Sequence, residues 1–176
     1  MTQTADLVQC DKAGNEMSLY LNTGTCDTPV WIFHKGVIGD LNLGETENEN
    51  EQSSRDPAQI VRQYSEDKID VEISGEQQVD SFYEGFVFLN SMRNRGDSRD
   101  VCILTGYMSE VGNVGWRGKF RNFDRSISGP ESGSQRQTFR LKPAACVTAA
   151  CKVRPVQVAT ADAVADYDPT TFEPTE

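Results

Sequence analysis

Alternating apolar and polar residues recur along the chain, and this two-residue period predicts a protein built mainly from β-strands. Ile69, Val71 and Ile73 alternate with polar residues, which predicts a strand with one buried face and one face that contacts water or a neighbour. A change in the parity of the apolar residues within 114–128 predicts a bulge or bend near Arg121 and Asn122. Similar runs predict further strands over 17–21, 30–33 (buried), 38–43, 100–107, 135–142 and 152–158.

Residues 80–94 follow the helical period instead, and they form the one helix that we expect. Ser81 followed by Glu84 matches a capping box, in which each side chain accepts a backbone N–H of the first turn. Gly85 inside a helix costs about 1 kcal/mol relative to Ala, so we expect it to allow close packing on the sheet. The side chains that we expect to pack this helix are Phe82, Tyr83, Phe86 and Leu89.

These elements predict an α+β, mainly β fold: a β-sandwich or barrel of about seven or eight strands with one flanking helix. A chain of 176 residues is normally a single domain, which we place at 28–158. An N-terminal arm, 1–27, precedes it, and an acidic C-terminal tail, 159–176, follows it. Residues 44–57 contain no apolar side chain before Pro57 and predict a long polar loop.

The net charge of −10 argues against a general nucleic-acid binder, because phosphate contacts require clustered Lys and Arg. No apolar run is long enough to span a membrane, and the first residues lack the features of a signal peptide. The charge is uneven: 40–56 holds six acidic residues and one basic residue, whereas 84–142 holds six acidic and ten basic residues. Surfaces of opposite sign on identical copies favour head-to-tail association, although solvated loops explain the same pattern.

The sequence contains no convergent set of catalytic or metal-ligating residues. His34 is the only histidine and lies in a strand-like run, so we expect a structural role for it. The odd number of cysteines, five, and the missing signal peptide predict reduced thiols, with Cys102 buried as a small apolar side chain. Common nucleotide-binding, metal-binding and nucleophile motifs do not occur. We therefore predict no enzyme activity, no cofactor and no metal site.

The order of elements resembles that of the tail tube (major tail) proteins of long-tailed bacteriophages. The resemblance covers 30–157: a strand pair, the polar loop, the strand 69–75, the helix, the strand 100–107, the segment 115–120 and the turn 126–130 leading into 138–141. It implies a hexameric ring that stacks into a hollow tube, in which the sheets of six subunits join into one β-barrel around the channel. It also implies a virion tail component, assembled in the host cytoplasm, whose partners are itself and other tail proteins. Genomic DNA would pass through the channel without specific binding, and no membrane would be involved.

In this family the long loop and the terminal arms touch neighbouring rings, which assigns the acidic loop to an inter-ring contact. The candidate contact residues of the loop are Glu45, Glu47, Glu49, Glu51, Arg55 and Asp56, and the four glutamates would share one face of an extended chain. Their candidate basic partners on the next subunit are Arg117, Lys119, Arg121 and Arg125. Two alternatives stay open: a β-sandwich binding module that uses its loops, and a head–tail joining or tail-terminator component.

Overall fold

The computed structural model describes residues 17–47, 50–53, 60–63, 69–92, 97–129, 133–146 and 148–167 of the chain. Within these residues, ten strands form one antiparallel sheet and two more form a separate ribbon, with one α-helix beside them. The mainly β fold with a single helix is therefore confirmed. The elements are β1 (Ser18–Asn22), β2 (Trp31–Phe33), β3 (Val37–Glu47), β4 (Asn50–Ser53), β5 (Ile60–Gln63), β6 (Ile69–Gln78), α1 (Glu84–Ser91), β7 (Arg99–Leu104), β8 (Val114–Asp124), β9 (Ile127–Ser128), β10 (Arg136–Pro143), a 3-10 helix (Ala149–Cys151), β11 (Arg154–Thr160) and β12 (Ala163–Asp166).

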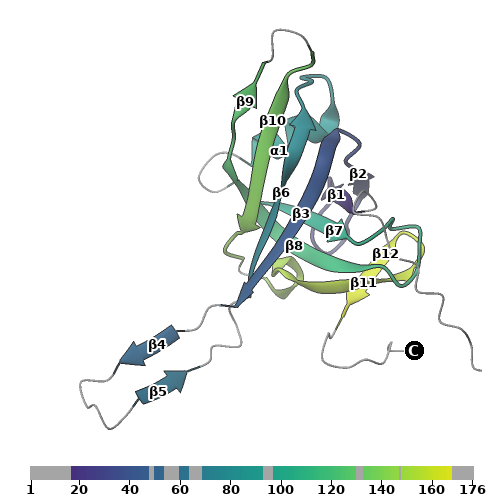
Figure 1. The fold of residues 1–176 in the computed structure, drawn as a ribbon. Helices are drawn as coiled ribbons and strands as arrows, with labels where there is room; N and C mark the ends of the chain where they lie inside the picture. Colours follow the sequence, from purple (N-terminus) through teal and green to yellow (C-terminus); the bar gives the residue numbers. More distant parts are fainter. Residues whose placement is uncertain are drawn as a thin grey trace, which may run out of the picture.

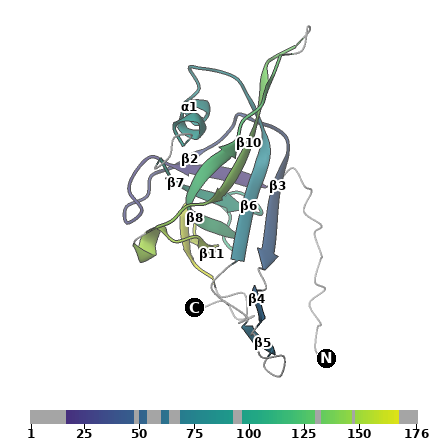
Figure 2. The same ribbon diagram turned by 90° about the vertical axis from the view of Figure 1, so that its left-hand side faces the viewer.

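Strand β8 is the centre of the sheet because it pairs with three other strands. One of its edges pairs with β7, while the other pairs with β11 as far as Arg117 and with β10 from Phe120 onward. Gly118 lies where the partner changes, and a Cβ on it would come within 2.5 Å of the Cα of Val153. The sheet thus divides into two layers that cross in Figures 1 and 2, one of β3, β6 and β10 and one containing β1, β2, β7 and β11.

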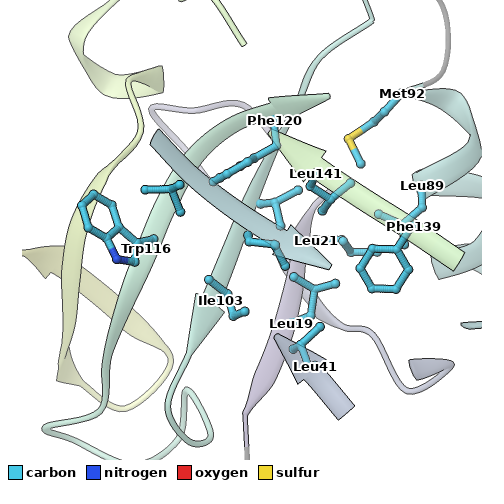
Figure 3. Close-up of a cluster of buried hydrophobic side chains, with 13 residues drawn as sticks. Leu19, Leu21, Leu41, Leu89, Met92, Ile103, Trp116, Phe120, Phe139 and Leu141 are labelled. Atoms are coloured by element: carbon cyan, nitrogen blue, oxygen red, sulfur yellow. The ribbon is translucent and has the colours of Figure 1, made fainter. Parts of the chain in front are cut away.

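The main hydrophobic core fills the space between these two layers (Figure 3). Leu19 and Ile103 come from one layer, Leu41 and Phe139 come from the other, and β8 contributes Phe120. A second cluster covers the opposite face of β1 and β7 and consists of Tyr20, Cys102, Leu104, Met108, Val156 and Val158. Strand β7 is therefore buried on both faces, which explains why its residues 101–104 are all apolar.

Most of the predicted strands are present, and two details differ. Residues 30–33 are predicted to be buried, but β2 lies at an end of the sheet, where Trp31 and Ile32 are half-buried and Phe33 is exposed. The bulge expected near Arg121 and Asn122 is confirmed one residue further on. Arg140 pairs with Asp124 and Leu141 pairs with Asn122, so the intervening residue of β8 has no partner of its own.

Helix α1 is shorter than the predicted 80–94, and its start differs from the predicted capping box. The N-cap residue is Tyr83, which makes no side-chain capping bond. Asp80 forms a turn before the helix instead, because its Oδ1 accepts the N–H of Phe82 at 2.9 Å. That turn leaves Phe82 97% exposed, so its predicted packing role is wrong. Leu89, in contrast, is fully buried in the core.

The predicted arms and loop contain regular structure. Strand β1 lies inside the expected N-terminal arm, 1–27, and is buried between β2 and β7, so the arm boundary is wrong there. Strand β12 lies inside the expected tail, 159–176, and pairs with β11. The expected loop, 44–57, contains the end of β3 and all of β4. In each case backbone pairing with another strand outweighs a polar local composition. No helix among the described residues is long and apolar enough to cross a membrane.

Candidate assembly interface

The outward face of the layer formed by β3, β6 and β10 is polar apart from Gly44 and Ile38, which is the register partner of Glu76. Strand alternation sends Ile73, Phe139 and Leu141 into the core, so their neighbours in sequence point away from it. In register across the three strands, the outward residues are Ile38, Asn42, Gly44 and Thr46 of β3, Asp70, Glu72, Ser74, Glu76 and Gln78 of β6, and Arg136, Thr138, Arg140 and Lys142 of β10. We refer to this set as the polar face.

Ion pairs connect β6 to β10 across the polar face. Both carboxylate oxygens of Glu72 are engaged, since Oε1 lies 2.8 Å from Arg140 Nε and Oε2 lies 3.2 Å from Lys142 Nζ. Glu76 pairs with Arg136 over a longer distance, 3.7 Å. These side chains are all partly exposed to solvent. With Asp70 included, the polar face carries equal numbers of acidic and basic residues.

Strand β3 forms an open edge of this layer. In the part of the chain that the structure describes, its only strand partner is β6, so the backbone groups along its other edge have no strand opposite them. The strand is 11 residues long. A long exposed edge is a template for adding another strand, and monomeric proteins usually shorten or shield such edges.

The ribbon of β4 and β5 continues from the same two strands. Glu47 at the end of β3 is the register partner of Ile69 at the start of β6, so the chain leaves and re-enters the sheet at adjacent points. Figures 1 and 2 show the ribbon beyond that end of the layer, away from the core. Within it, Glu51 lies opposite Arg62. The other predicted loop residues, Glu49, Arg55 and Asp56, lie outside the described residues.

The carboxylate of Glu45 is engaged inside the subunit. Its Oε1 accepts the indole N–H of Trp116, and it points to the same side of β3 as Leu41 and Leu43, toward β8. Glu45 therefore does not belong to the polar face. Glu45 is nevertheless exposed, and its predicted contact with a neighbouring ring stays a prediction.

Arg117 is wrong as a partner for a neighbouring subunit, because it is only 6% exposed. Its Nη2 lies 3.0 Å from Asp100 Oδ2 and donates to the backbone oxygen of Cys26 at 2.7 Å. Asp100 Oδ2 also accepts the side-chain N–H of Asn22 at 2.8 Å. The guanidinium stacks over Trp31, 5.1 Å from the ring centroid. This network ties the loop between β1 and β2 to β7 and β8.

The remaining predicted basic partners occupy different environments. Lys119 is half-buried and lies opposite Asp100 in the register of β7 and β8. Arg121 is half-buried over the ring of Phe123, with its guanidinium carbon 5.3 Å from the centroid. Arg125 lies just beyond the end of β8 and is exposed. Contacts of these three residues with a second subunit stay a prediction.

A disulfide bond replaces two of the predicted reduced thiols. Cys26, in the loop after β1, is bonded to Cys151, in the 3-10 helix, with their Cα atoms 5.6 Å apart and a separation of 125 positions in sequence. No local spacing indicates this pair, because only the tertiary fold brings the two segments together. Cys102 is fully buried as predicted, and burial raises the pKa of its thiol well above the ordinary value.

His34 links the helix to the sheet through a buried polar network. It is 1% exposed, and its Nε2 lies 3.1 Å from Gln77 Oε1. Gln77 donates to Gln137 at 2.8 Å, and Gln137 exchanges hydrogen bonds with Asn90 of α1. Burial lowers the pKa of His34 to about 4, and the hydrogen bond with Gln77 partly opposes this shift. The neutral ring is therefore a structural element, as the sequence predicts.

The helix packs closely on this histidine because of a glycine. A Cβ on Gly85 would come within 2.2 Å of His34 Nδ1, so no larger residue fits there without a shift. The expected close packing at Gly85 is thus confirmed, although the contact is with the residue after β2 and with Tyr83. Tyr83 stacks on the His34 ring with a centroid separation of 5.6 Å.

Comparison with solved structures shows the class of fold. The tail of an empty gene transfer agent particle, solved with C6 symmetry, matches at 12% sequence identity and a TM-score of 0.55, covering 77% of this chain and 96% of that chain. The SPP1 tail tube matches at 10% identity and a TM-score of 0.54, covering 75% of each chain. No protein-family model and no curated protein matches the sequence. The chain therefore has the fold of phage tail tube proteins, as the resemblance in sequence pattern predicts.

Proposed function

We propose that this protein is a structural subunit of a phage-type tail tube, in which copies of it form hexameric rings that stack around a channel for DNA. The shared fold supports this proposal. The observation that carries it is the long open edge of β3 beside a polar sheet face. Strands added along such an edge would extend the sheet from one subunit to the next, with main-chain hydrogen bonds providing affinity.

The polar face is the surface best suited to line the channel. On the outer face of the other layer, the second hydrophobic cluster buries Tyr20, Cys102 and Leu104, so this part of the face is not open to solvent. The face of β3, β6 and β10 is polar and uncovered in the single subunit. A ring joined through the edge of β3 would present this face as a continuous wall.

The ribbon of β4 and β5 is suited to the contact between rings. It leaves the layer at the ends of β3 and β6, beyond the sheet that would form the wall. A projecting element on one end of a subunit makes a heterologous contact, and heterologous contacts propagate into open filaments. In this role the protein would act in the virion tail, with further tail proteins as partners at the ends of the tube and with no catalytic step.

Negative-stain electron microscopy of the purified protein tests this function. We expect rings or tubes of regular diameter that form without any other component. A protein that stays monomeric at high concentration, with no rings in any field, would contradict the proposal and favour a β-sandwich binding module. Single rings that never stack would favour a joining or terminating component instead.

A further inference from the structure

The cations of the polar face are already occupied by carboxylates of the same subunit. Arg140 and Lys142 are two residues apart on β10 and share one partner, Glu72 on β6. Arg136, on the same face, is paired with Glu76. Every Lys and Arg of the polar face therefore has a carboxylate within 4 Å.

Stability does not explain this arrangement. The side chains of Arg136, Arg140 and Lys142 are 52%, 51% and 36% exposed, and ion pairs this exposed add little to the stability of a fold. Glu72 and Glu76 have a larger effect on the binding of anions to this surface than on the stability of the fold. Unpaired Lys and Arg bind DNA phosphates by releasing counterions, irrespective of base sequence.

We propose that Glu72, with Glu76 in a lesser role, prevents the polar face from retaining duplex DNA by occupying the cations that would otherwise contact phosphates. The inference rests on the proposed function, in which this face meets passing DNA. A wall of balanced charge neither binds the phosphate backbone nor repels it strongly, so DNA moves along it with little resistance. Glu72 has the larger role because both of its oxygens hold a cation, at 2.8 and 3.2 Å.

The test compares the full-length protein with its Glu72→Gln variant by fluorescence anisotropy of a labelled duplex DNA, at protein concentrations that give no rings. Freeing two cations should add about two phosphate contacts and steepen the slope of log affinity against log salt by about 2. The added affinity should fall about tenfold between 50 and 200 mM salt.

Two further variants identify the cause. Glu84→Gln, in the first turn of α1, makes the same change in net charge away from the polar face and should bind DNA as weakly as the unmodified protein. Arg140→Gln and Lys142→Gln, added to Glu72→Gln, should remove the gain. If Glu72→Gln is folded by thermal unfolding and binds DNA no better than Glu84→Gln, the inference is overturned.

The outcome is separate from that of the proposed function. DNA binding is measured on unassembled protein, whereas the proposed function depends on rings and tubes seen by electron microscopy. Tubes without a gain in DNA affinity would leave the function standing and reject the role of Glu72. A gain in DNA affinity without any tubes would contradict the proposed function. It would still show that Glu72 occupies cations that otherwise bind DNA.

Discussion

A few buried side chains fix the position of the loop between β1 and β2. Arg117 reaches this loop through the backbone oxygen of Cys26 and through the ring of Trp31, while Asp100 neutralises its charge. An ion pair this deeply buried is sensitive to the loss of one partner, because the other charge then stays in a poorly solvated site. A second buried side chain, His34, is held neutral by the same lack of solvent.

Replacing Arg117 with Ala should lower the free energy of unfolding by about 3–5 kcal/mol, since Asp100 would lose its counter-charge. Urea unfolding followed by tryptophan fluorescence or circular dichroism measures the change. Arg125→Ala removes the same side chain from an exposed position and should stay within about 0.5 kcal/mol of the unmodified protein. Equal stabilities for the two variants would show that the buried pair is not formed.

The stability should depend on pH through His34. Its pKa is about 4 in the folded protein and 6.5 when unfolded, so the unfolded chain takes up the proton first as the pH falls. The stabilisation is complete above pH 6.5 and decreases as the pH falls toward 4, by about 3 kcal/mol at pH 4. His34→Gln retains an N–H donor for Gln77 and should lack this part of the pH dependence. Parallel curves for the two proteins between pH 7 and 4 would contradict the assignment.

At the scale of elements, strands β3 and β6 have three roles. Their inward residues complete the core, their outward residues carry the ion-paired face, and their ends continue into the ribbon of β4 and β5. The ribbon projects beyond the end of the layer, away from the core (Figures 1 and 2). Its removal should therefore affect assembly far more than folding.

A variant that replaces residues 48–68 with Asn-Gly would join Glu47 to Ile69 through a two-residue turn. These residues are opposite each other in the register, and a two-residue turn suits an antiparallel pair at this point. We expect a folded protein whose thermal unfolding is cooperative and which forms no tubes in electron micrographs. Tubes of normal length from this variant would show that the ribbon is not the inter-ring contact.

At the scale of the whole molecule, one continuous sheet forms both layers, and one covalent cross-link joins segments that are distant in sequence. The sheet passes between layers at β8, around Gly118. The disulfide joins Cys26 to Cys151 over a separation of 125 positions in sequence. A cross-link that closes so long a loop restricts the unfolded chain more than the folded one.

Replacing Cys26 with Ser should lower the free energy of unfolding by about 2–5 kcal/mol through the loss of this cross-link. Denaturant unfolding without reductant measures the effect. Cys146→Ser changes a free cysteine that is likewise half-buried and should have little effect. Reductant should bring the unmodified protein to the stability of the Cys26 variant. An unfolding midpoint that does not respond to reductant would show that the bond does not contribute.

Local patterns were sufficient for the class of fold and for much of its strand structure. Alternation located β3, β6, β8 and β10, and the parity change in 114–128 located the bulge to within one residue. These features depend on neighbours in sequence, whose side chains must point alternately into the core and away from it. The helix was less well predicted, because the side chain of Asp80 forms a turn where Ser81 had suggested a cap.

The partners of the charged side chains depend on tertiary structure alone. A sequence shows that Glu72 and Arg140 each lie on the polar side of a strand, but not that β6 and β10 are neighbours in register. The same holds for Arg117, which has the sequence context of a surface residue and the environment of a core residue. Pairing between distant strands depends on how the whole core packs. The partner of each charged side chain is therefore determined by the tertiary structure and not by the local sequence.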